Sequence, residues 1–364
     1  MTTLAQSDAP CRVLGGVDTH KDVHVAAVID DVGRILATAS FPTTRPGYRQ
    51  LFVWLRGFGE IVAVGVEGYG SWGAGLARDL TARGVRVVEV NRPNRQTRRR
   101  RGKSDTVDAE AAARAVLAGD ATVTPKTGTG PIEALRQLRV ARGGAMKART
   151  AAANQLHSLI DTAPDPVRAQ LRALSFKQKV ALVASWRPRN ATTPEGASRY
   201  ALCSVARRWR DLAVEIGELD ARIKVILDDI AAPLLAVHGV GPDTAGQLLV
   251  TAGDNPDRLS HERSYAALCG SSPVEVSSGR TNRHRLNRGG DRHANSALWR
   301  IVIVRMNSHQ PTKDYIARRT AEGLSKQEII RCLKRYVARE LFRHLQHAVT
   351  DPHHEVPALV QRAA

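Results

Sequence analysis

A short stretch near the N-terminus, in which an acidic residue directly ends an apolar run, constrains the fold of this chain most strongly. Residues 13–17 are aliphatic or glycine and predict a buried strand, and Asp18 follows at once. After four polar residues, apolar side chains return at every second position: Val23, Val25, Ala27 and Ile29. This alternation predicts a second strand. Because a carboxylate beside a core must be solvated, paired or bound to a metal, Asp18 marks a candidate site.

The first 120 residues predict an α/β domain with a mixed sheet. Strand and helix signals alternate after an initial three-strand meander, in the order βββαβαβα. The expected strands cover 13–18, 22–30, 34–40, 60–67 and 85–90, and the expected helices begin after Pro46 and cover 72–82 and about 105–117.

From about residue 130 to 231 the pattern becomes helical. Residues 132–160 are rich in Ala and Arg, and the stretch 205–230 repeats apolar residues about every 3.5 positions, as in a coiled-coil seam. The seam consists of Leu212, Ile216, Leu219, Ile223, Ile226 and Ile230. Between the two helices, 163–198 contains prolines and is expected to be irregular. Two interpretations stay open: a helical hairpin that packs on its own domain, or an oligomerisation arm.

A third region, from near Pro233 to about 347, ends in an amphipathic helix expected over 326–345. We therefore predict an N-terminal α/β domain, a helical coiled-coil region, a mostly helical C-terminal domain and a short tail. Their expected bounds are 1–125, 126–231, 232–350 and 351–364.

The charge balance predicts a polyanionic partner. The chain has 54 Lys and Arg against 35 Asp and Glu, a surplus typical of nucleic-acid-binding proteins. No apolar run approaches the length of about 18 residues that a membrane span needs, and the first residues lack the apolar core of a signal peptide. Four separated cysteines without a CxxC pair suggest neither disulfides nor a zinc site. We expect a cytoplasmic protein that binds nucleic acid and does not enter a membrane.

Four acids in the first domain occupy positions suited to a metal site. Asp18 and Glu67 each end a predicted strand, while Asp105 and Asp108 lie three residues apart at a helix start and share a face. If the first and fourth strands are neighbours, these carboxylates meet, and paired Mg²⁺ ions for phosphoryl transfer need such oxygen ligands. Three of the acids also have a clear structural interpretation: Asp105 as an N-cap, Asp108 as a first-turn acid, and Glu67 as the start of a glycine-rich turn. The structural interpretation is weakest for Asp18, which directly ends an apolar strand.

Two stretches are candidates for phosphate contacts. The segment 92–103 holds seven basic residues in twelve, including Arg98, Arg99, Arg100, Arg101 and Lys103. A second strip near the C-terminus contains Arg280, Arg283, Arg285, Arg288 and Arg292. A solvated charged loop is the alternative for the first stretch.

The stretch 234–249, LLAVHGVGPDTAGQLL, has the form of a helix-hairpin-helix. In such a motif Gly239 and Gly241 would let the backbone approach a phosphate, and the start of the following helix would face that phosphate. An ordinary glycine-containing turn between helices is the alternative.

Several motifs together resemble one family. The element order resembles the RuvC-like ribonuclease-H fold, and GVDTHKDVH, VEGYGSWGAGL and KSDTVDA resemble the DEDD-type insertion-sequence transposases, relatives of the Piv invertases. The later segments SSG and HRLNRGGDRHANSAL resemble the second domain of the same family. The resemblance implies that Asp18, Glu67, Asp105 and Asp108 are catalytic and hold Mg²⁺, two ions being expected. It also implies a nucleophilic serine, which we place at Ser278 with Ser277 as the alternative.

The resemblance further implies a DNA transposase or site-specific recombinase that works through a serine–DNA covalent intermediate. It implies a homo-oligomer, dimer or tetramer, and a structured bridge RNA that pairs with donor and target DNA. The serine would be activated by the carboxylate site across the gap between the domains. Two other hypotheses stay open: a RuvC-type junction endonuclease that uses water, and a non-catalytic nucleic-acid-binding protein.

Overall fold

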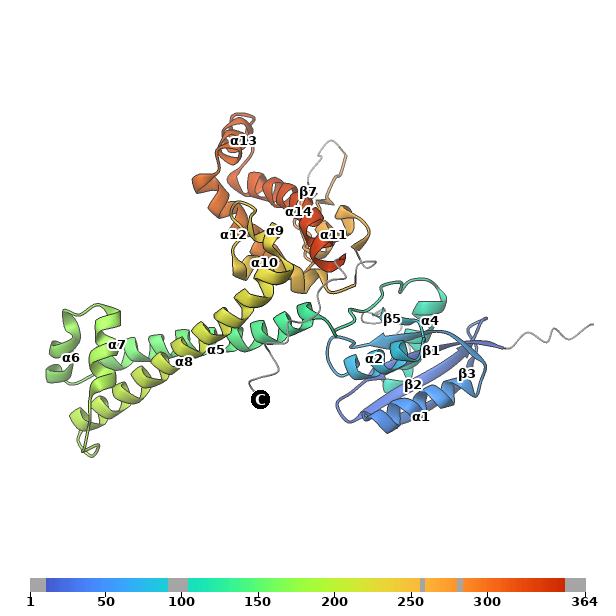
Figure 1. Ribbon diagram of the computed structural model, residues 1–364, viewed down its shortest axis with the longest axis horizontal. Coiled ribbons are helices and arrows are strands. Elements are labelled where there is room, and N and C mark those ends of the chain that lie inside the picture. The colour runs from blue at the N-terminus through green and yellow to red at the C-terminus, as the bar shows by residue number, and fades with distance from the viewer. Residues whose placement is uncertain (1–10, 91–103, 256–258, 280–283, 351–364) are drawn as a thin grey trace, which may run out of the picture. The chain divides into compact units, whose positions relative to one another are not determined.

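The computed structural model describes residues 11–90, 104–255, 259–279 and 284–350 (Figure 1). The chain divides into two compact units, Met1–Gly128 and Thr129–Ala364.

The first unit is built on a five-stranded sheet of order β3-β2-β1-β4-β5. Strands β1 to β3 form an antiparallel meander, while β4 pairs parallel with both β1 and β5. The prediction of a mixed α/β sheet is therefore confirmed. Its elements are β1 (Arg12–Thr19), β2 (Val23–Asp30), β3 (Ile35–Pro42), α1 (Arg45–Arg56), β4 (Glu60–Glu67), α2 (Ala74–Ala82), β5 (Val87–Val90) and α4 (Asp105–Leu117).

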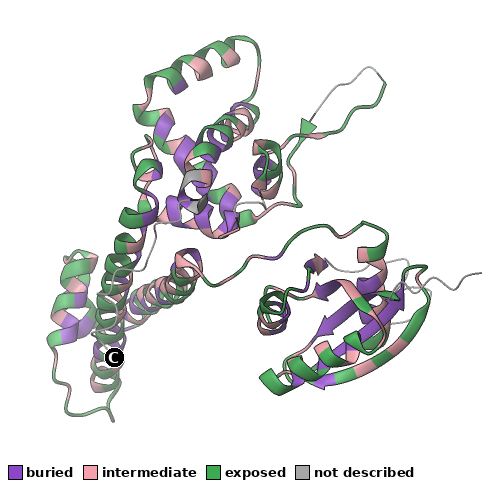
Figure 2. Ribbon diagram, turned by 45° about the vertical axis from the view of Figure 1, so that its right-hand side comes forward, coloured by how far each residue is buried: buried purple, intermediate pink, exposed green. Residues whose placement is uncertain are grey.

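Side-chain alternation along the strands builds a core on each face of the sheet. Val17 and Val28 pack with residues of α1 and α2 on one face. Leu14 and Ile29 pack against α4 on the opposite face. Because successive residues of a strand point to opposite faces, Asp18 lies on the same face as Leu14, the face that α4 covers. Figure 2 shows the central strands largely buried.

His24, in β2, is a fully buried histidine of the first unit. Its ring stacks on Tyr48 of α1 with 5.7 Å between ring centroids. Neither ring nitrogen has a hydrogen-bond partner within the described part of the chain. Burial, helped by the charge of His20, lowers the pKa of His24 to about 4, so the imidazole is neutral in the folded protein at neutral pH.

We expect His24 to make the protein less stable in mild acid. Its folded pKa of about 4 lies below the ordinary value of 6.5, so its contribution is fully present above pH 6.5 and is lost as the pH falls toward 4. The loss amounts to about 3 kcal/mol. Urea unfolding between these pH values measures it, and His24→Phe should flatten the pH dependence by that amount. An unchanged dependence in the variant would contradict the assignment.

Among its described residues, the second unit is helical except for one short hairpin. Its elements are α5 (Pro131–Asp161), α6 (Asp165–Arg172), α7 (Phe176–Ser185), α8 (Pro194–Ile230), α9 (Ala232–Leu235), α10 (Pro242–Ala252), α11 (Glu262–Leu268), β6 (Val274–Glu275), β7 (His284–Arg285), α12 (Arg292–Ser308), α13 (Gln310–Ala321) and α14 (Lys326–Thr350). The expectation of a mostly helical C-terminal region is confirmed.

Helices α5 and α8 form a long antiparallel pair (Figure 1). Every second seam residue of α8, at Ile216, Ile223 and Ile230, is buried, and those between them are partly exposed. At one end of the pair, Ile132 and Ile230 join the core formed by the C-terminal helices. The predicted coiled-coil seam of α8 therefore packs, at least in part, against α5 of the same chain, as in a helical hairpin.

The expectation that 163–198 is irregular is wrong, because this stretch contains α6 and α7. The prolines that suggested irregularity begin helices instead: Pro166 lies in the first turn of α6 and Pro194 in that of α8. No intrahelical N–H bond is needed there, so proline is tolerated. Val167 and Val180 are buried against the far end of the α5–α8 pair, where they form a separate core.

Candidate functional site

The end of β1 brings two of the predicted acids together. Strands β1 and β4 run parallel with Val17 opposite Val66, so Asp18 and Glu67 end neighbouring strands at one edge of the sheet. The Thr19 hydroxyl donates a 2.7 Å hydrogen bond to the main-chain oxygen of Glu67 and ties the strand ends together. Alternation places both carboxylates on the face covered by α4.

Helix α4 approaches this edge because β1 and β4 carry glycine beneath it. A Cβ at Gly16 would lie 2.2 Å from the main-chain oxygen of Ala109 and the main-chain nitrogen of Ala113. A Cβ at Gly65 would lie 2.8 Å from the main-chain oxygen of Ala112. Without side chains at these positions, the helix backbone rests directly on the strands.

The start of α4 supplies the other two acids. Ser104 caps the helix, its hydroxyl accepting a 3.4 Å hydrogen bond from the Val107 amide, and Asp105 and Asp108 occupy the first turn. Asp108 is buried on the sheet side, and Asp105 is exposed. Ser104, and not Asp105, is the cap, so the N-cap interpretation of Asp105 is wrong. A helix start favours acids, but it does not account for the burial of Asp108.

The His20 side chain lies between an acid of β1 and an acid of α4. It was not selected as a site residue from the sequence. Its Nε2 lies 3.2 Å from Oδ2 of Asp18 and 3.4 Å from Oδ1 of Asp105. One ligand atom from each of these three residues lies within 4.8 Å of the others. The available signal was its position two residues after Asp18, just beyond the strand end.

The electrostatics of this cluster suit a bound cation. Burial raises the pKa of Asp18; the charge of His20 opposes that effect, and the neighbouring Asp108 and Asp105 add to it. A bound divalent cation would offset both the cost of burying the charged Asp18 carboxylate and its repulsion by Asp108 and Asp105. Carboxylate oxygens are the donors that hard cations such as Mg²⁺ prefer, so the residues present fit such an ion.

The predicted serines lie on the hairpin of the second unit. In this hairpin Val274 pairs with Arg285 and Glu275 with His284. Ser277 and Ser278 follow β6 and are exposed, and Gly279 turns the chain with a φ of 57°. Only glycine adopts this left-handed conformation at little cost. The two hydroxyls therefore lie on a surface turn that an external substrate can reach.

Residues 290–295, just after the hairpin, contact the segment that precedes it. A Cβ at Gly290 would lie 2.2 Å from the main-chain nitrogen of Gly270, so the two segments cross in contact. Asp291 caps α12 and accepts a 2.7 Å hydrogen bond from the Thr251 hydroxyl. The Asn295 amide donates to the main-chain oxygens of Cys269 and Gly270 at 2.9 and 3.0 Å. Residues 290–295 therefore serve to hold the hairpin in place.

The structure describes only some of the residues that we predicted to contact phosphate. Those outside the described residues are Arg98, Arg99, Arg100, Arg101, Lys103, Arg280 and Arg283. The others, Arg285, Arg288 and Arg292, are exposed on β7, on the loop after it and at the start of α12.

The candidate helix-hairpin-helix has an unusual second helix start. Gly239 has a φ of 83° and Gly241 precedes α10 directly, but α9 has only four residues. Asp243, in the first turn of α10, forms an ion pair with Arg139 at 3.0 Å and another with Arg300. Although burial opposes its ionisation, these arginines hold the pKa of Asp243 below its ordinary value. This helix start therefore already carries an anion.

Comparisons with known proteins point to insertion elements. A family model for DEDD transposases of the IS110 type, described as "Transposase", matches residues 15–163. A second, described as "Transposase IS116/IS110/IS902 family", matches residues 231–317. The chain is 32% identical over 152 residues to an uncharacterized 43.6 kDa protein of insertion element IS110 from Streptomyces coelicolor. The match covers 40% of this chain and 36% of that relative. In the described part of the chain, no helix is long and apolar enough to cross a membrane.

Proposed function

Because the chain belongs to the IS110 family of DEDD transposases, we propose that it cuts and rejoins DNA as the transposase of an insertion sequence. The observation that carries this proposal is the meeting of Asp18 and Asp105 at His20, on the sheet edge where Glu67 ends its strand. Carboxylates from separate elements on one site are typical of metal-dependent phosphoryl transfer.

We propose a RuvC-like ribonuclease-H fold for the N-terminal domain, which the strand order β3-β2-β1-β4-β5 and the helices on both faces support. The division of the remaining chain at about residue 231 stays a prediction. The helix-hairpin-helix at 234–249 also stays a prediction, supported by the left-handed Gly239.

Asp18, Glu67, Asp105 and Asp108 are the proposed ligands of Mg²⁺, two ions being expected. When bound, the ions would favour the deprotonated form of the attacking hydroxyl and stabilise the leaving oxygen. The protein holds the carboxylates close before any ion binds, since Gly16 admits α4 to the sheet and the His20 ring lies between two of the acids.

Ser278, with Ser277 as the alternative, is the proposed nucleophile. Its Oγ would form a bond to phosphorus as the bond from phosphorus to a sugar oxygen breaks; the serine proton leaves, and the sugar oxygen is released as a hydroxyl. Attack of a second sugar hydroxyl on the phosphoserine link would reseal the strand and return the serine. The exposed position of both serines beside Gly279 supports this role.

The proposed partners are donor and target DNA, a structured bridge RNA, and further copies of the chain as a dimer or tetramer. The formal net charge of +19 supports a nucleic-acid partner. The α5–α8 pair is the element we propose for oligomerisation.

Trapping of a covalent protein–DNA adduct tests the serine mechanism. The unmodified protein, incubated with element-end DNA and Mg²⁺ and then denatured, should retain DNA on the protein. Ser278→Ala should abolish the adduct, whereas Ser264→Ala, on an exposed position of α11, should leave it intact. If Ser277→Ala abolishes the adduct and Ser278→Ala does not, Ser277 is the nucleophile.

Two outcomes would overturn the serine mechanism. One is an adduct that survives in the double variant of Ser277 and Ser278. The other is DNA cleavage by the unmodified protein without any adduct, which would favour the water-using RuvC-type endonuclease.

A further inference from the structure

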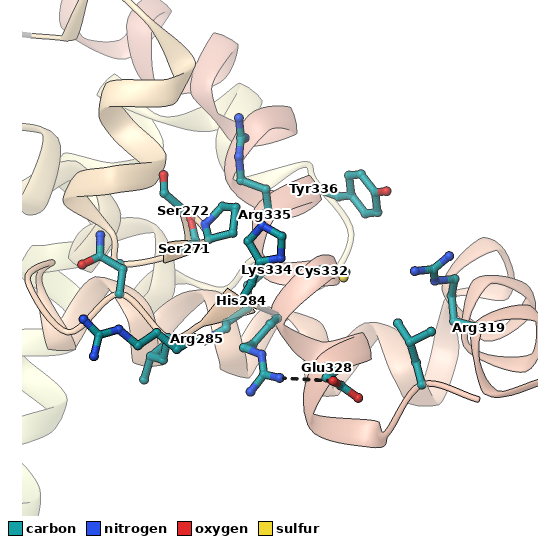
Figure 3. A pocket seen from close by; sticks show the side chains of 16 residues that line it. Ser271, Ser272, His284, Arg285, Arg319, Glu328, Cys332, Lys334, Arg335 and Tyr336 are labelled. Atoms are coloured by element: carbon teal, nitrogen blue, oxygen red, sulfur yellow. Dashed lines mark ion pairs between the residues drawn. The ribbon is translucent and has the colours of Figure 1, made fainter. Parts of the chain in front are cut away.

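A cavity of about 840 Å³ lies within the second unit, between the serine-bearing hairpin and helix α14. Its wall includes the loop 270–273 and the second hairpin strand, and α13 contributes to its far side. Figure 3 shows Arg285, Arg319, Lys334 and Arg335 around this hollow.

The cavity is strongly cationic. Its basic lining residues are His284, Arg285, Arg319, Arg331, Lys334 and Arg335, and they face a single acid, Glu328. Three of these arginines have acidic neighbours: Arg319 pairs with Glu322, Arg331 lies 3.9 Å from Glu328, and Arg335 donates a 2.7 Å hydrogen bond to Glu262.

Arg285 and Lys334 are two further cations of the cavity lining. Within the described part of the chain, neither forms an ion pair. Arg285 is exposed on β7, where its guanidinium can reach a ligand at the cavity mouth. The cavity thus keeps positive charge in excess, and an anion can balance it.

Lys334 places part of this charge inside the protein. It is only 6% exposed, and its Nζ donates a 2.9 Å hydrogen bond to Oδ1 of Asn295. An ammonium has three N–H donors, so two remain for a ligand. Burial, together with the nearby Arg331, lowers the pKa of Lys334, which means that the charged form is held at a cost in the empty cavity.

We propose that this cavity binds a backbone phosphate of the DNA strand whose neighbouring phosphodiester the hairpin serine attacks. The proposal rests on the proposed function for the identity of the strand. A phosphate supplies negative charge for both cations, and acceptor oxygens for the guanidinium of Arg285 and for the two remaining N–H donors of Lys334. Asn295, bound to both Lys334 and the loop at Gly270, couples this phosphate to the base of the hairpin.

The spacing along the hairpin fits a single continuous strand. Ser278 lies three residues beyond the end of β6 at Glu275, whose partner His284 lines the cavity. Three residues span at most about 10 Å, so Ser278 and the cavity wall lie within reach of one short stretch of a single strand. The cavity would therefore position the strand rather than take part in the chemistry.

Equilibrium binding of a labelled single-stranded DNA oligonucleotide tests this proposal. It is measured with the full chain carrying Ser277→Ala and Ser278→Ala, so that no covalent step intervenes. Adding Arg285→Gln and Lys334→Gln should weaken binding about tenfold and reduce the slope of log affinity against log salt by about 1.4, or about 0.7 per lost contact. Lys334→Met should weaken binding as well, with far-ultraviolet circular dichroism as the check on folding.

The matched control also removes two positive charges, through Lys313→Gln on α13 and Arg343→Gln on α14, two residues that do not line the cavity. Both residues are exposed, and we expect a change of less than about twofold. Equal losses in the control and the cavity variant would overturn the proposal. A loss confined to an RNA oligonucleotide of the same sequence would also overturn it.

This binding test separates the cavity from the serine mechanism. If the cavity variant loses DNA affinity although the protein with both serines intact forms no adduct, the phosphate site stands and the serine mechanism fails. If adducts form normally and the cavity variant binds DNA like its control, the serine mechanism stands and the phosphate site fails.

Discussion

Asp18→Asn is expected to lower DNA cleavage by at least about 100-fold while leaving the chain folded. Asp18 is the buried member of the cluster with Asp105 and His20, and it lies beside the strand end at Glu67. An amide keeps the shape of the side chain but removes the negative charge that a cation requires. In the absence of a divalent ion the variant should be at least as stable as the parent, because burial and like charges disfavour the ionised carboxylate.

Mg²⁺ titration provides a second measurement that does not depend on activity. An ion that binds only the folded state raises the melting temperature by an amount that grows with its concentration relative to its Kd. We expect a Mg²⁺-dependent rise in the parent and its loss in Asp18→Asn, with Glu67→Gln showing the same pattern.

Asp30→Asn is the matched control for this prediction. Asp30 has the same 8% exposure as Asp18, but it lies at the other end of the neighbouring strand pair, where it accepts hydrogen bonds from the amides of Val32 and Arg34. Asp30→Asn should be less stable than the parent but should show the same Mg²⁺-dependent rise in melting temperature. If Asp18→Asn and Glu67→Gln both recombined DNA normally in a plasmid excision assay, the non-catalytic nucleic-acid-binding hypothesis would replace the transposase mechanism.

Gly16→Ala is expected to destabilise the first unit by about 3 kcal/mol and to displace two of the acids. The new Cβ would meet main-chain atoms of Ala109 and Ala113 at 2.2 Å, and backbone of a packed helix cannot yield as a flexible side chain can. The helix must move away from β1, which carries Asp105 and Asp108 away from Asp18. Weakened Mg²⁺ binding should therefore accompany the loss of stability.

Urea unfolding and the Mg²⁺ thermal shift together measure both effects of Gly16→Ala. Gly217→Ala is the control, because Gly217 lies within α8 and a Cβ there would meet no atom within 4 Å. Alanine is more favourable than glycine within a helix, so the free energy of unfolding of this control should rise by about 0.5–1 kcal/mol. Equal stability of Gly16→Ala and the parent would contradict the close packing of α4 on the sheet.

Local patterns predicted much of the secondary structure. The strand expected at 60–67 and the helix expected at 105–117 have the observed bounds, because a short apolar run and the apolar positions of a helix depend on residues close together in the sequence. The prediction failed at 163–198, where proline was interpreted as a helix breaker although two of the prolines begin helices.

The candidate site was predicted less completely than the fold. Asp18 stood out because a carboxylate that directly ends an apolar strand is costly, and the carboxylates at 67, 105 and 108 fitted the same pattern. His20 was not selected, since nothing in its local sequence separates a turn histidine from one that bridges two acids. Lys334 looked like an ordinary helical lysine, because its burial depends on Asn295 and on the loop at Gly270.

The alternation of strands and helices, the positive charge and the acid at the end of the first strand can all be derived from the sequence. They depend on composition or on residues that are neighbours along the chain. The position of His20 between Asp18 and Asp105, and the cationic cavity between α14 and the hairpin, become evident only in the folded chain. Those contacts join segments far apart in the chain, so they depend on strand register and on how closely a helix can approach a glycine.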